Sequence, residues 1–147
     1  MSLWRKLFGG GQSVTPKPQR LDYLNEALAL ERQGDYEAAL TSYRLALRDN
    51  PNDLRILQNM AIAFTKTGQQ EEAIRFYRRA LQLDDGLVGA HYGLAFRLKE
   101  RGELVQAAKH LRAFLSRPPK GADAERWVHH AEATLREIET SSAPESS

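Results

Sequence analysis

The chain has 147 residues, the size of one ordinary domain, and 41% of them are hydrophobic, so it can build a core. It has no cysteine, which excludes disulfides and Cys-ligated metal sites, and no stretch approaches the roughly 18 apolar residues of a membrane-spanning helix. The net charge of +2 conceals an asymmetry, because residues 1–20 carry four basic and no acidic side chains while the remainder holds 17 basic against 19 acidic groups. The body of the protein is therefore not basic.

Residues 1–19 form a basic leader without the continuous apolar segment of a secretory signal. If Ser2–Phe8 is helical, one face is apolar and the other cationic, and a glycine hinge and a Pro-rich spacer follow. The expected anchor residues are Leu3, Trp4, Arg5, Lys6, Leu7 and Phe8. This composition predicts a short interfacial anchor for an anionic membrane surface. Docking into another subunit, and self-packing or disorder, remain alternatives.

The next 102 residues contain a period of 34 residues. The same residue type recurs at three positions in each period: Gly34, Gly68, Gly102; Ala39, Ala73, Ala107; Ala27, Ala61, Ala95. A fixed period of this length is typical of stacked repeats. We therefore expect three copies, at residues 20–53, 54–87 and 88–121.

Each copy has the pattern of a helical hairpin. Apolar residues at spacings of three and four predict a helix over Leu21–Gln33. Gly34 can end it in the left-handed conformation, and Asp35 can cap the next helix, which Pro51 stops. Small residues such as Ala27 allow the two helices to approach closely.

This pattern resembles the tetratricopeptide repeat, a 34-residue helix–turn–helix unit. The resemblance implies an all-α fold, a right-handed α-solenoid of three hairpins with a concave groove lined by the first helix of each hairpin. After the third copy, residues 122–140 have an amphipathic pattern with Asp123 as the expected cap and Trp127 on the apolar face. We interpret this segment as a helix that covers the open end of the stack, with a partner-docking helix as the alternative. Residues 141–147 are expected to be disordered.

The resemblance also implies which side chains face the groove. They are Leu24, Asn25, Leu28, Arg55, Gln58, Asn59, Ile62, Tyr92, Phe96 and Lys99. Asn25 and Asn59 occupy equivalent positions, where the family often uses an amide to hold a peptide backbone. Gly93 takes that position in the third copy and is expected to open a space. The apolar members suit an amphipathic helix or an extended hydrophobic peptide of a protein partner.

Other binding chemistries find little support. A related subclass clamps acidic carboxyl termini with cationic groove residues, but here those positions include Leu24, Leu28 and Gly93. Arginines such as Arg44 and Arg78 recur on the second helices beside glutamates, a pattern we interpret as a solvated outer face rather than a nucleic-acid site. The residues form no recognisable catalytic, metal or cofactor constellation.

These patterns predict a non-enzymatic scaffold or adaptor that binds a partner peptide or helix in its groove. Its N-terminal segment would tether it to a membrane surface or to a larger complex. An accessory structural subunit built permanently into a large assembly is the alternative. The expected location is the cytoplasm, either free or at the inner face of a membrane.

Overall fold

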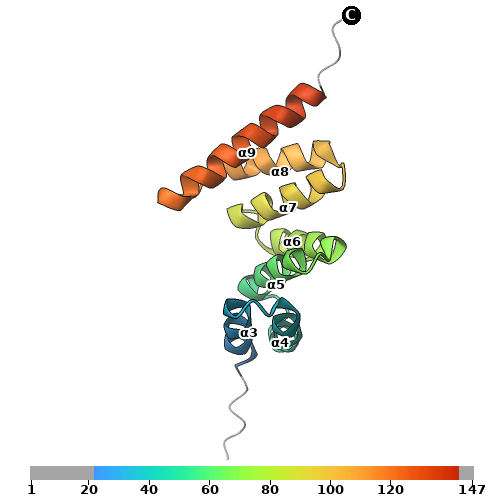
Figure 1. Cartoon of the computed structure of the whole chain (residues 1–147), viewed down its shortest axis with the longest axis vertical. Coiled ribbons are helices and arrows are strands. Elements are labelled where there is room, and N and C mark those ends of the chain that lie inside the picture. Colours follow the sequence, from blue (N-terminus) through green and yellow to red (C-terminus); the bar gives the residue numbers. More distant parts are fainter. Residues whose placement is uncertain (1–21, 143–147) are drawn as a thin grey trace, which may run out of the picture.

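The structure is a computed structural model that describes residues 22–142. This part of the chain is entirely helical and forms three successive hairpins followed by one longer helix (Figure 1). The helices are α3 (Tyr23–Arg32), α4 (Tyr36–Asp49), α5 (Leu54–Lys66), α6 (Gln70–Leu83), α7 (Val88–Glu100), α8 (Leu104–Ser116) and α9 (Ala122–Ser141). Each packs against the next in chain order, which gives an extended stack. The expected all-α solenoid of hairpins is confirmed.

The turns within the hairpins follow the sequence signals. Gly34, Gly68 and Gly102 have φ values of 80°, 76° and 81°, in the left-handed region where glycine has no Cβ penalty. The Asp35 side chain accepts a hydrogen bond from the Ala38 amide at 3.1 Å and so caps α4. The first two helices therefore reverse direction over a three-residue turn.

Small residues mark the places where the helices of a hairpin cross. The six alanines that keep the 34-residue register are all fully buried: Ala27, Ala39, Ala61, Ala73, Ala95 and Ala107. Larger side chains fill the layers between hairpins, with Tyr43 and Phe64 buried in the first half and Leu98 and Phe114 in the second. Phe76 packs against both groups and joins them.

Helix α9 departs from the expectation in two details. It begins at Ala122, so Asp123 lies in its first turn and does not cap it, and Gly121 precedes it with a φ of 119°. Its most buried side chains include Ala131 and Ile138, whereas Trp127, predicted on the buried face, is 45% exposed. The helix thus packs on α8 through both small and aliphatic side chains and leaves its indole partly free.

The anchor residues of the leader and the last five residues of the tail lie outside the described residues. Within residues 22–142, no helix combines the length and the apolar composition that crossing a bilayer requires.

Candidate functional site

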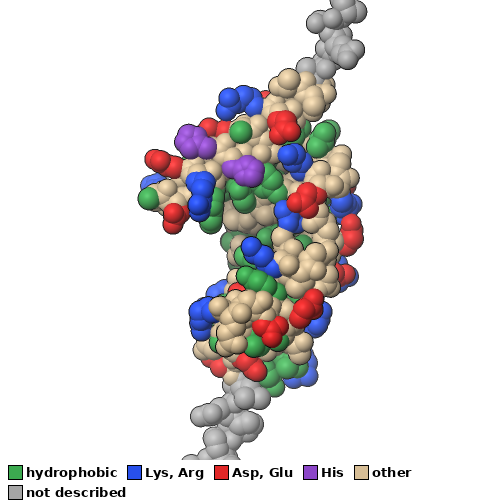
Figure 2. All heavy atoms as spheres, in the orientation of Figure 1, with side chains coloured by type: hydrophobic (Ala, Val, Ile, Leu, Met, Phe, Trp, Pro, Cys, Tyr) green, Lys and Arg blue, Asp and Glu red, His purple; other side chains and the backbone are tan. Residues whose placement is uncertain are grey.

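The predicted groove residues lie on the first helices of the three hairpins, α3, α5 and α7, and we call them together the groove face. None of them is fully buried, and Ile62 is 41% exposed although it is a large aliphatic side chain. Figure 2 shows hydrophobic side chains gathered beneath α9, where the outline of the molecule is hollowed. Apolar surface therefore remains accessible on this part of the protein.

Aromatic rings form the C-terminal end of the groove face. The ring of Tyr92 lies 4.7 Å from that of Phe96, 5.0 Å from Phe114 and 5.9 Å from Trp127, between ring centroids. The His130 ring lies 4.6 Å from Phe96. Burial among these groups raises the pKa of Tyr92. Offset and tilted rings at these separations stabilise one another, so the cluster holds α7 and α9 in place.

Helix α9 is thus part of the groove face, which the sequence pattern did not predict. Besides Trp127 and His130, it contributes Glu137, whose carboxylate lies 3.6 Å from the ammonium nitrogen of Lys99. Lys99, which was predicted to face the groove, therefore forms an ion pair with α9. These three α9 side chains lie on or beside the apolar face that the sequence predicts for residues 122–140. The sequence alone does not show which residues of the preceding hairpin they contact.

The N-terminal end of the groove face is polar. The hydroxyl of Tyr43 and one carboxylate oxygen of Glu31 are buried and make no hydrogen bond with any described residue. Burial raises the pKa of Tyr43, the nearby Glu31 carboxylate raises it further, and Asn59 and Arg55 oppose the shift. Burial likewise raises the pKa of Glu31. Both atoms are enclosed by the fold, and the Glu31 carboxylate and the Asn59 amide are the polar groups that act on the Tyr43 hydroxyl.

The two predicted backbone-binding amides differ in their surroundings. The side chain of Asn25 donates to the carboxylate of Asp22, which also accepts from the Asn25 amide at 3.1 Å. Asn59 instead lies near the Tyr43 hydroxyl. Asn25 is therefore tied to the start of its own helix, whereas Asn59 lies at the junction of α5 with α4.

The expectation for Gly93 was wrong. A Cβ atom on Gly93 would lie 2.3 Å from Cζ of Tyr77, so the phenol ring of α6 fills the space that the missing side chain leaves. Burial raises the pKa of this phenol. The third copy has no opening at this position.

The arginines of the second helices were predicted to form a solvated outer face, but several of them line hollows in the surface. Arg44, Arg48, Arg75 and Arg79 line one surface hollow, and Arg75, Arg78 and Arg79 line a second hollow beside it. The 34-residue spacing predicted that Arg44 and Arg78 occupy equivalent positions. It did not predict the recess between the helices.

The histidines form one close pair. Nδ1 of His91 lies 2.9 Å from Nδ1 of His110, and Nε2 of His91 lies 2.7 Å from the carbonyl oxygen of Asp85. Burial, followed by the charges of His91, Lys109 and Arg78, lowers the pKa of His110 to about 4. Among residues 22–142, no three metal-ligating side chains lie close enough together to hold an ion.

Sequence comparison assigns the first two hairpins. Residues 20–85 match the family model of the tetratricopeptide repeat. No curated protein sequence matches the chain.

Several solved structures share the fold at low sequence identity. The type III secretion chaperone SycD of Yersinia enterocolitica, in complex with a peptide of the translocator YopD, is 18% identical with a TM-score of 0.75, covering 82% of this chain and 92% of that one. The Sgt2 TPR domain of Aspergillus fumigatus is 22% identical with a TM-score of 0.69, covering 90% and 89%. The first TPR of Spaghetti (RPAP3), bound to the HSP90 peptide SRMEEVD, is 19% identical with a TM-score of 0.71, covering 84% and 92%.

Proposed function

Because the chain is a tetratricopeptide repeat protein, we propose that it is a non-enzymatic adaptor whose groove face binds a peptide or amphipathic helix of a partner protein. The observation that carries this proposal is the accessible apolar surface of the groove face, where Ile62 and Trp127 are 41% and 45% exposed. Structural relatives with the same fold hold peptides, among them those of SycD and RPAP3.

The chemistry of the groove face favours an apolar ligand with a polar contact at one end. Ile62 and the Tyr92–Trp127 stack offer apolar contact area. At the other end, the half-buried side chain of Asn59 offers an amide for hydrogen bonding. A strongly acidic peptide is a poor fit, because Glu31 lies at this end and Lys99 is already paired. We therefore expect an aliphatic or aromatic motif in the partner.

A peptide-display selection tests this proposal. The full chain is used to select binders from random 12-residue peptides, and a selected peptide is synthesised and titrated by fluorescence anisotropy. Ile62→Lys should weaken binding at least tenfold, because it places a charge in an apolar contact. Val105→Lys is the matched control: Val105 is 81% exposed on α8, a second helix, so this substitution should change affinity less than twofold. Failure to select any peptide, or equal losses in both variants, would contradict the proposal.

We also propose that residues 1–19 tether the adaptor to an anionic membrane surface or to a larger complex. The support is the composition of Leu3–Phe8, which combines four apolar and two cationic side chains. The alternative function, a structural subunit built permanently into a large assembly, predicts different behaviour of the purified chain in solution. Light scattering should show the purified adaptor as a stable, non-aggregating species, whereas a permanent subunit would aggregate when separated from its assembly.

A further inference from the structure

A second surface, formed by α4 and α6, carries a concentration of arginines. Two adjoining hollows of about 490 and 560 Å³ lie along these helices and share Glu72, Arg75 and Arg79 in their walls. We call the arginines that the two second helices contribute the arginine face: Arg44, Arg48, Arg75, Arg78 and Arg79. The groove face lies on the first helices and on α9, whereas these arginines come from α4 and α6. Met60 and Phe64 of α5 also line one of the two hollows.

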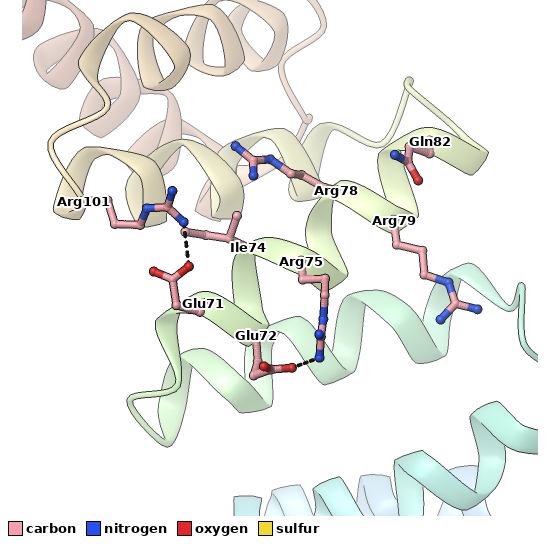
Figure 3. A pocket seen from close by; sticks show the side chains of 8 residues that line it. All are labelled: Glu71, Glu72, Ile74, Arg75, Arg78, Arg79, Gln82 and Arg101. Atoms are coloured by element: carbon pink, nitrogen blue, oxygen red, sulfur yellow. Dashed lines mark hydrogen bonds and ion pairs between the residues drawn. The ribbon is translucent and has the colours of Figure 1, made fainter.

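The positive charge of the arginine face is only partly neutralised. Together the two hollows are lined by six arginines and two glutamates. Glu72 pairs with Arg75, and Glu71 pairs with Arg101 at 2.8 Å. In Figure 3 the guanidinium group of Arg79 extends away from both glutamates, and neither Arg78 nor Arg79 is joined to a glutamate. Arg44, Arg48 and Arg78 form no ion pair within residues 22–142.

Aromatic rings back some of these guanidinium groups. The rings of Phe64 and Phe76 lie 5.2 Å apart, the guanidinium of Arg44 lies 5.9 Å from the Phe64 centroid, and that of Arg75 lies 5.8 Å from the Phe76 centroid. A planar cation held against a ring loses less conformational freedom when it binds a ligand. Arg79 is also held in place, since it donates to the carbonyl oxygen of Pro51 at 2.6 Å. The arginine face is thus partly organised for binding.

We propose that the arginine face binds an acidic, extended peptide segment of a partner protein. Carboxylates fit the planar fork of arginine through paired N–H···O bonds, and a strand of alternating side chains can follow a recess between two helices. The anion would relieve the repulsion among arginines that now lack acidic partners. This site gives the adaptor a second binding surface. It prefers an acidic ligand, whereas the groove face prefers an apolar one.

Other anionic partners fit this surface less well. Single-stranded nucleic acid needs exposed rings for base stacking, but Phe64 is 2% exposed and Phe76 is half-buried. Membrane binding by a helix combines cations with inserted apolar side chains. The large apolar side chains that are exposed in residues 22–142 are Ile62, Leu83, Val105 and Trp127, and none of them lines either hollow.

Fluorescence anisotropy with the full-length chain tests the proposal. The probe is a labelled 12-residue peptide of alternating Glu and Ser, compared with a peptide of alternating Gln and Ser. We expect the chain to bind the first probe at 50 mM NaCl and not the second. Arg44→Gln combined with Arg78→Gln should weaken binding of the Glu–Ser peptide at least tenfold.

A charge-matched control distinguishes binding at the arginine face from general electrostatic attraction between the peptide and a basic protein. Arg32→Gln combined with Arg136→Gln removes the same charge from exposed positions on α3 and α9, and should change binding less than twofold. The basic leader is present in every variant, so its contribution is the same throughout. Absence of binding to the Glu–Ser peptide, or equal losses in the two double variants, would overturn the proposal. Tighter binding of oligothymidylate or of phosphatidylglycerol vesicles, lost with Arg44 and Arg78, would also overturn it by assigning the surface to another class of ligand.

Discussion

The phenol ring of Tyr77 on α6 occupies the space beside Gly93 on α7, and so locks the second hairpin against the third. A Cβ atom at Gly93 would lie 2.3 Å from Cζ and 2.5 Å from the hydroxyl oxygen of this ring, far inside van der Waals contact. One repeat earlier, the equivalent pair is Tyr43 and Asn59, which also lie near each other. The same junction between hairpins is therefore built once with an amide and once with a bare backbone.

The first prediction concerns this junction. Gly93→Ala should lower the free energy of unfolding by about 1–3 kcal/mol, because the added methyl group forces the buried Tyr77 ring to move. Urea denaturation of the full chain measures the change. In a Tyr77→Leu background the same substitution should cost less, since the ring is gone.

Gly89→Ala is the matched control on the same helix. A Cβ atom there would meet only Oε1 of Gln58, at 3.8 Å, so alanine should be tolerated and can stabilise α7 by up to about 1 kcal/mol through its higher helix propensity. Equal effects of Gly89→Ala and Gly93→Ala would show that Tyr77 does not control the junction.

These residues also show what could be predicted from sequence. The hairpins followed from local signals, because helix periodicity, Gly34 and Asp35 act within a few residues of one another. The contact of Tyr77 with Gly93 could not be predicted in this way. It joins different hairpins, and its existence depends on how two helices are oriented in three dimensions.

The groove face was likewise only partly predictable. The register of the repeat placed Ile62 and Tyr92 on first helices, and the structure has them there with accessible surface. The register says nothing about α9, which lies outside the period and brings Trp127 and His130 against the third hairpin. Because α9 is not part of a repeat, the register does not show how the helix is rotated about its axis. Only the structure shows which of its side chains are exposed.

The second prediction separates the buried and exposed faces of α9. Ile138 is 4% exposed, so Ile138→Ala should lower the free energy of unfolding by about 2–4 kcal/mol through the cavity it leaves. Trp127→Ala should cost only about 1 kcal/mol, because the indole contacts Tyr92 but remains 45% exposed. Thermal and urea denaturation measure both variants. A larger loss for Trp127→Ala would mean that the indole is structural rather than available to a ligand.

The third prediction follows from the histidine pair. The position of Asp85 indicates that His91 donates from Nε2 to its carbonyl oxygen, so His91 Nδ1 accepts from His110 Nδ1. The pKa of His110 is lowered from its ordinary 6.5 to about 4. Between these values the unfolded chain binds a proton that the native chain does not. The free energy of unfolding should therefore decrease as the pH falls from about 7 to 4, and this contribution should be constant below pH 4.

The expected loss is about 1–2 kcal/mol, because His110 is only partly buried and solvent screens the interaction. Urea denaturation between pH 7 and 4 measures it, and His110→Phe, which cannot titrate, should flatten the profile. His129→Phe is the control, since His129 is exposed on α9. Identical slopes for the wild type and His110→Phe would remove His110 as the cause.

The fourth prediction is a pH dependence of the free energy of unfolding that is opposite in direction to that of His110. Burial raises the pKa of Glu31 above its ordinary 4.5, so the native chain holds a proton that the unfolded chain has already released. The contribution of this group to the free energy of unfolding is fully present below pH 4.5 and is lost as the pH rises through the native pKa. Glu31→Gln should therefore be more stable than the wild type at pH 7, by less than about 1 kcal/mol, and equal to it at pH 4. Denaturation at these two values checks this, and a variant less stable at pH 7 would show that the carboxylate is needed by its neighbours.

The last prediction concerns the leader. Trp4→Ser combined with Phe8→Ser keeps its charge but removes its two aromatic side chains, so it separates insertion from electrostatic attraction. If the segment is an interfacial anchor, wild-type chain should sediment with vesicles containing phosphatidylserine and the variant should sediment several-fold less, since the apolar face supplies the area buried in the bilayer. One anchor of this size binds weakly, so the assay needs millimolar lipid. Arg5→Gln combined with Lys6→Gln should lose binding as well, and raising the salt concentration should weaken the wild type. Equal sedimentation of wild type and both variants would contradict the membrane anchor, because these variants remove the apolar and cationic side chains that a lipid surface would contact.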